Sequence, residues 1–224
     1  MYELLTGPGL WLSVGICLIG LTVQGVLYVK ELHWQLDRVA YRAHPKAGMK
    51  EHSGQSFLSA SFGTRSWRTQ PFMTLLFFIF HIGAIGIPLF LFAHNMVLSE
   101  TFGFSFFSIN QTVADIMSWG VLVSAALLAI RRLVLPEVRI LTTFYDYLIL
   151  FLSAAPFITG LICRYEIDDY SFFIILHILF GEILLIAIPF TKLSHILLFF
   201  LSRAQLGMDF GIKRGGMKGK GLAW

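Results

Sequence analysis

The chain has 224 residues, of which 56% are hydrophobic and 13% are charged, and its formal net charge is +4 at pH 7. A soluble domain carries about 25% charged residues, and the mean hydropathy here is +0.73, so the composition excludes an ordinary soluble protein and indicates an integral membrane protein. Membrane topology accounts for the excess of cations, which therefore indicates no nucleic-acid partner.

Five apolar runs are long enough to cross a hydrocarbon core of about 30 Å, which takes about 20 helical residues. They cover residues 10–29, 72–98, 112–130, 142–163 and 171–201. The leader before the first run contains Glu3 and neither Lys nor Arg, so we expect a retained helix rather than a secretory signal. The fifth run exceeds a simple span, and Pro189 predicts a tilt or a kink in it. The predicted fold is an all-α, five-helix transmembrane bundle over residues 1–201.

The remaining segments are polar. Residues 31–70 mix basic, aromatic and small residues, and they form either a solvated loop with some interfacial anchoring or an interfacial amphipathic helix. Residues 202–224 form a basic tail rich in Gly and Lys. The cations fall in alternate connections between the spans, with Arg164 as the exception. The positive-inside rule therefore predicts an N-terminus outside and a C-terminus inside, with lipid as the first partner.

Four histidines fall within these predicted spans, His81 and His94 in the second and His177 and His195 in the fifth. The two helices run in opposite directions, so His81 and His195 lie toward the inside, and His94 and His177 lie toward the outside. Two facing pairs of imidazoles are what two six-coordinate hemes stacked across a membrane require. For any one of these histidines alone, a hydrogen-bonded interior side chain is the alternative.

The turn of an α-helix places the two histidines of the fifth span on one face, but it does not do so for the two histidines of the second span. The eighteen residues from His177 to His195 make about five whole turns, which places both rings on one face. The thirteen residues from His81 to His94 leave the rings about 140° apart on an unbroken helix. Pro88 lies between these two, and a kink there could rotate the outer half. Small residues that allow close helix approach lie near the proposed ligands, at Gly83, Gly86 and Gly181.

Charged and polar residues near the ends and the middle of the spans complete the candidate site. Four cations either contact the propionates of an inner heme or simply anchor helices at the membrane surface: Arg131, Arg132, Arg139 and Lys192. Glu182 lies near the middle of the fifth span, where it serves a proton route, contacts a neighbouring subunit or is a paired interior acid. Four further residues either handle protons on the outer side or are interfacial polar groups: Asn95, Glu100, Asp115 and Asp169.

Three stretches carry a resemblance to a known family. They are Phe-His-Ile-Gly-Ala-Ile-Gly-Ile at 80–87, Arg-Arg-Leu at 131–133 with Pro136, Arg139 and Asp146 after it, and 176–195, which contains Leu-His and Pro-Phe-Thr-Lys-Leu-Ser-His. In these the chain resembles the heme b membrane subunit (gamma subunit) of respiratory nitrate reductases. The last stretch is the most specific, because it keeps both histidines at the family's separation. Residues 99–111 contain no counterpart of the lysine that this family associates with quinol.

The resemblance implies five transmembrane helices, two b-type hemes and electron exchange between a quinone pool and iron–sulfur proteins. By motif, His81 and His195 would hold the cytoplasmic-side heme, and His177 would hold the outer heme. His94, which lies at the same membrane depth as His177, would be the second ligand of the outer heme. Menaquinone would be the quinone. Similar subunits occur in transmembrane redox complexes of sulfate-reducing organisms, such as the high-molecular-weight cytochrome (Hmc) complex, with multiheme cytochromes c and NrfD-like membrane subunits.

We therefore expect a diheme cytochrome b in a bacterial or archaeal inner membrane. It would be an electron-transfer subunit of an oxidoreductase complex, conducting electrons between a periplasmic cytochrome or quinone pool and a cytoplasmic iron–sulfur partner. One alternative is a heme-free transporter or proton channel that uses His94, His177 and Glu182 as a relay. A second alternative is a structural anchor whose hemes take no part in electron transfer.

Overall fold

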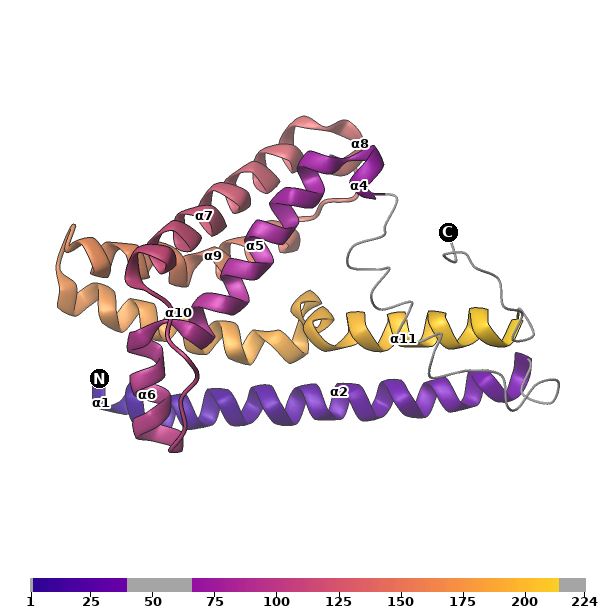
Figure 1. Ribbon diagram of the computed structural model, residues 1–224, viewed down its shortest axis with the longest axis horizontal. Coiled ribbons are helices and arrows are strands. Elements are labelled where there is room, and N and C mark those ends of the chain that lie inside the picture. Colours follow the sequence, from indigo (N-terminus) through magenta and orange to yellow (C-terminus); the bar gives the residue numbers. More distant parts are fainter. Residues whose placement is uncertain (1, 40–65, 214–224) are drawn as a thin grey trace. The chain divides into compact units, whose positions relative to one another are not determined.

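A computed structural model describes residues 2–39 and 66–213, and within these ranges the chain is built of helices (Figure 1). In chain order they are α1 (Tyr2–Leu4), the π-helix η1 (Leu5–Gly9), α2 (Leu10–Val39), α4 (Ser66–Thr69), α5 (Pro71–Phe90), α6 (Phe92–Phe102), α7 (Gln111–Val134), α8 (Pro136–Arg139), α9 (Phe144–Tyr165), α10 (Tyr170–Phe190), the 3₁₀-helix η2 (Lys192–Ser194) and α11 (His195–Lys213).

Five helical stretches in the described part are long and apolar enough to cross a membrane, which confirms the prediction of an all-α protein with five transmembrane helices. They are Tyr2–Glu31, Pro71–Phe90, Gln111–Val134, Phe144–Tyr165 and Tyr170–Phe190. Helix α2 continues to Val39 and α11 to Lys213, so helix extends into both segments that we expected to be polar connections. The rest of the predicted loop, at 40–65, and of the predicted tail, at 214–224, lies outside the described residues.

The helices belong to two compact units, Met1–Val14 with Phe72–Leu185, and Gly15–Pro71 with Ile186–Trp224. In the first unit, buried side chains of α5, α7 and α9 meet in a core at Ile87, Val121 and Phe157. Gly83 lies so close to Val121 and to the Met117 carbonyl that a side chain there would have no room. Gly83 and Gly86 thus serve the contact of α5 with α7.

The predicted second span is not one helix over 72–98, because α5 ends at Phe90 and the chain is extended at Leu91 (ψ 134°) before α6 begins. Pro88 removes one N–H from the last turn of α5, which weakens the helix there. The extended residue is stabilised from outside, since Leu91 forms a short parallel bridge with Ile109 and the Ile109 N–H donates to the Phe90 carbonyl at 2.9 Å.

The predicted fifth span is also interrupted, because α10 ends at Phe190 and Thr191 is extended (φ −125°, ψ −176°). The Thr191 hydroxyl accepts from the Leu193 N–H at 3.2 Å, in place of the Pro189 carbonyl that an unbroken helix would offer. Gln24 of α2 compensates, since its amide donates to the Pro189 carbonyl at 2.9 Å. His177 and His195 therefore lie on different helices, and the five-turn calculation, which assumes one continuous helix, does not apply.

Candidate functional site

His94 of α6 and His177 of α10 lie close together in the first unit, with nearly parallel rings. Their ring centroids are 5.9 Å apart, and the ring planes differ by 13°. Both side chains are half-buried. The structure thus brings together the pair that helix direction grouped by depth, although an unbroken helix would have turned His94 away. We call His94 and His177 the paired-histidine site.

The break at Leu91 is what places His94 in this site. The extended residue ends the helical phase set by α5, so the angle calculated for thirteen continuous helical residues no longer applies. α6 starts again one residue later and carries His94 in its first turn. The His94 Nδ1 atom lies 3.4 Å from the Ile87 carbonyl oxygen, so the end of α5 also contacts the ring.

His177 is held by α9. Its Nδ1 atom lies 2.8 Å from the Pro156 carbonyl oxygen and 3.3 Å from Thr159 Oγ1. Gly160 supplies the space, because a Cβ atom there would lie 3.1 Å from Cε1 of the imidazole. Pro156, Thr159 and Gly160 were not among the site residues predicted from the sequence. The available signal was a proline and a glycine four residues apart within an apolar span, a combination that weakens a helix unless it has a packing role.

The chemistry of the two rings suits metal ligation. Burial lowers the pKa of His94, which lies outside the five spans, so its imidazole is neutral near pH 7. Both rings direct Nδ1 at a backbone carbonyl, and a carbonyl accepts only from the Nδ1–H tautomer, in which Nε2 carries the lone pair. Two imidazoles bound on opposite sides of one metal through bonds of about 2 Å have centroids about 6 Å apart. The observed centroid distance of 5.9 Å matches that spacing, and ligation requires the in-plane lone pair of each Nε2 to point at the metal.

The other two predicted ligands lie in different units, His81 in the first and His195 in the second. The Nδ1 atom of His81 lies 2.7 Å from the Phe77 carbonyl oxygen, and that of His195 lies 2.7 Å from the Lys192 carbonyl oxygen. Each ring is therefore oriented by the backbone three or four residues earlier in its own segment. Their mutual pairing stays a prediction.

The four predicted propionate contacts lie at helix ends. Arg131 and Arg132 occupy the last turn of α7, Arg139 ends α8, and Lys192 begins η2 in the second unit. Arg131 is about 30 Å along α7 from Gln111 at its first turn. Thus Arg131 and Arg132 lie at the opposite end of α7 from the segment that leads out of α6. Their expected role, beside His81 and His195, stays a prediction.

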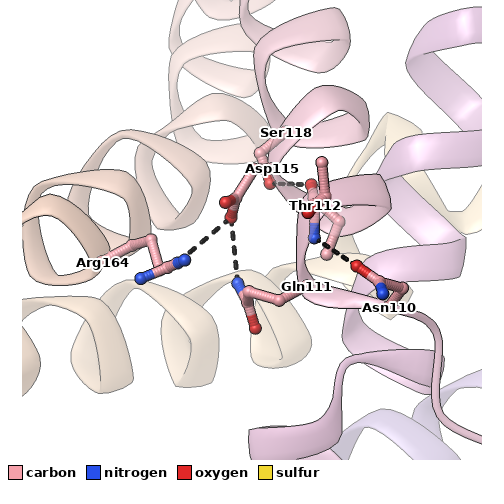
Figure 2. A network of polar contacts seen from close by, with 7 residues as sticks. Asn110, Gln111, Thr112, Asp115, Ser118 and Arg164 are labelled. Atoms are coloured by element: carbon pink, nitrogen blue, oxygen red, sulfur yellow. Dashed lines mark hydrogen bonds and ion pairs between the residues drawn. The ribbon is translucent and has the colours of Figure 1, made fainter.

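Three of the four polar residues that we considered for proton handling have structural partners; the Asp169 carboxylate accepts from the Ser171 N–H at 2.9 Å. Asn95 is only 4% exposed; its Oδ1 accepts from the Phe106 N–H at 2.8 Å, and its Nδ2 donates to Ser108 Oγ at 3.3 Å. It thereby ties the aromatic segment after α6 to that helix. Figure 2 shows Asp115 between Gln111, which donates to it at 2.9 Å, and Arg164, whose Nε lies 3.4 Å away. This ion pair gives a local role to the cation that departed from the topology pattern.

Glu182 is buried in α10, 8% exposed, and its Oε1 has no hydrogen-bond partner among the residues described. It lies beside Gly9, where a Cβ atom would be 2.7 Å from Oε1. The described residues contain no cluster of three or more His, Cys, Asp or Glu that could hold a metal ion. The paired-histidine site, with two imidazoles, is a different kind of arrangement.

Comparison with known proteins gives one full-length relative. The chain is 50% identical over 227 residues to a protein of Nitratidesulfovibrio vulgaris (strain Hildenborough), and the match covers 100% of both chains. No family model matches the sequence. No solved structure matches it. The chain belongs to the same family as this Nitratidesulfovibrio vulgaris protein.

Proposed function

We propose that the chain is a diheme cytochrome b subunit that conducts electrons across a membrane within a respiratory redox complex. The observation that carries the proposal is the closeness of His94 and His177, whose ring centroids are 5.9 Å apart and whose Nδ1 atoms are both directed at backbone carbonyls. The five apolar helices and the resemblance to the heme b subunit of nitrate reductases support it.

The residues of the chain have distinct parts in this function. Nε2 of His94 and of His177 would bind the iron of one heme b, which supplies the one-electron chemistry. The Pro156 carbonyl and the gap at Gly160 orient His177, and the broken helix at Leu91 orients His94. His81 and His195 would hold the second heme b, with propionates reached by Arg131, Arg132, Arg139 and Lys192.

The partners follow from the cation distribution and the resemblance. With the N-terminus outside and the C-terminus inside, the basic segments face the cytoplasm of a bacterial or archaeal cell, where an iron–sulfur protein would dock. On the outer side a multiheme cytochrome c, or menaquinone, would exchange electrons with the paired-histidine site. An NrfD-like subunit would be a neighbour in the membrane. The oxidoreductase activity belongs to the complex.

Heme content tests the proposal. The purified chain should give a reduced-minus-oxidised spectrum of b type, and pyridine hemochrome analysis should give two hemes per chain. Substitution of His195 by Ala should remove one heme and stop electron transfer to the iron–sulfur partner, whereas His44→Ala, outside the four candidates, should do neither. A folded chain without heme b would contradict the proposal and favour the heme-free relay of His94, His177 and Glu182. Electron transfer that survives His195→Ala would favour a structural anchor.

A further inference from the structure

A buried carboxyl in α10 is unused by the proposed electron path. Glu182 lies within a span, is 8% exposed, and leaves Oε1 without a hydrogen bond among the described residues. An ionised carboxylate is strongly disfavoured in such a place unless a cation or several donors accompany it. The neutral acid, which carries its own proton, is the form that this environment tolerates.

No cationic side chain of α10 lies next to Glu182 to balance an ionised carboxylate. The residues three and four positions away share the face of Glu182, and all of them are apolar: Ile178, Leu179, Leu185 and Ile186. The nearest titratable residue on the helix is His177, five positions earlier and about 140° around the axis. The ion pair that the sequence left open as an alternative therefore has no partner on α10.

The element known to contact Glu182 is the N-terminal turn η1. Pro8 has no N–H and cannot make the backbone bond of an α-helix, and the turn takes the wider π form, in which the Leu10 N–H reaches the Leu5 carbonyl. This turn brings Gly9 against the carboxyl. A Cβ atom at Gly9 would lie 2.7 Å from Oε1 and 3.0 Å from the Leu4 carbonyl oxygen, so a side chain would displace the acid. Leu5–Gly9 contains no titratable side chain.

We propose that Glu182 and the turn Leu5–Gly9 form a proton-binding site inside the membrane. The turn covers the carboxyl, Gly9 leaves room for it, and the bound proton rather than a counter-ion neutralises it. The neutral acid can release and rebind a proton without leaving a permanent charge in the bilayer. This inference does not depend on heme, and it gives a membrane redox subunit a group able to carry a proton.

Carbodiimide labelling tests the site. A protonated carboxylic acid adds across dicyclohexylcarbodiimide and rearranges to a stable N-acylurea with no leaving group, whereas an ionised carboxylate does not react. The full chain in detergent at about pH 8, where ordinary carboxyls are ionised, should be labelled at Glu182, as mapped by mass spectrometry of peptides. Two controls in the same chain should stay unlabelled, the exposed Glu3 and the ion-paired Asp115.

Two glycines give a matched test of the turn. Gly9→Ala should change the labelling rate of Glu182 several-fold, because the new methyl group displaces the carboxyl. Gly7→Ala should not, because a Cβ atom there meets nothing within 4 Å. Absence of label at Glu182 in the folded wild type would overturn the proposal, as would label that persists in full in Glu182→Gln. Equal labelling rates in the two glycine variants would show that the turn Leu5–Gly9 is not part of the site. A labelled protein without heme would overturn only the proposed function.

Discussion

The two histidine pairs differ in what orients their rings. At the paired-histidine site, His177 is held by a carbonyl and a hydroxyl of another helix, and His94 contacts the end of the helix before its own. His81 and His195 instead rest on carbonyls of their own segments. Contacts from other helices thus orient the first pair, whereas the backbone contacts of His81 and His195 come from their own segments. Substitutions in α9, which holds His177, should therefore affect the heme of the paired-histidine site.

The largest effect is expected at Gly160. In Gly160→Val the new side chain would occupy the place of the His177 ring, because even Cβ would lie 3.1 Å from Cε1. We expect loss of one of two hemes, measured by pyridine hemochrome, with the heme of His81 and His195 retained. Gly181→Ala is the control on the helix of His177, since a Cβ atom there meets nothing within 4 Å. Equal heme loss from both variants would mean that general destabilisation, rather than displacement of the ring, is the cause.

Gly83 tests whether the packing of α5 on α7 is separate from ligation. Gly83→Leu would overpack the contact with Val121 and cost about 3 kcal/mol of stability. The thermal unfolding midpoint in detergent should fall, while the b-type spectrum below the transition stays unchanged. A normal midpoint with a changed spectrum would show that Gly83 contacts a heme rather than α7.

Substitution of Asn95 tests whether its hydrogen bonds hold the segment that follows α6. Asn95→Ala removes the acceptor of the Phe106 N–H, at a cost of about 1 kcal/mol. Hydrogen exchange should increase at residues 103–109, and the redox potential of one heme should shift because the segment beside its ligand loosens. Unchanged exchange there would show that the Asn95 contacts do not hold the segment.

The smallest effect is expected at Asp115. Asp115→Asn should change stability by at most about 0.5 kcal/mol, because Arg164 is half-exposed and water screens the pair. A double-mutant cycle with Arg164→Gln in chemical unfolding would measure the coupling. A coupling of several kcal/mol would mean that the ion pair is far less screened than its exposure indicates.

The number and type of the spans could be predicted, because the length and apolar character of a transmembrane helix appear directly in the sequence. The breaks at Leu91 and Thr191 could not be located. A proline weakens a helix nearby, but the residue at which the helix stops depends on the contacts that replace its hydrogen bonds. Here these are the Ile109 N–H for the first break, and Gln24 with the Thr191 hydroxyl for the second.

The candidate site was partly predictable for the same reason. Helix direction alone grouped His94 with His177, but the phase of an unbroken helix separated His94 from that face. The support from Pro156 and Gly160 depends on which face of α9 meets α10, which no local pattern reports. Glu182 was visible as an acid in an apolar span, whereas its cover by Gly9 depends on the π turn at Pro8.

Heme content of His94→Ala, His177→Ala and the double variant tests the central claim most directly. If both rings bind one heme, each single variant loses the same one of two hemes, and the double variant loses no more than either single variant. Pyridine hemochrome analysis should then give one heme per chain in all three. Full heme content in either single variant, or a double variant with no heme at all, would contradict the pairing of His94 with His177.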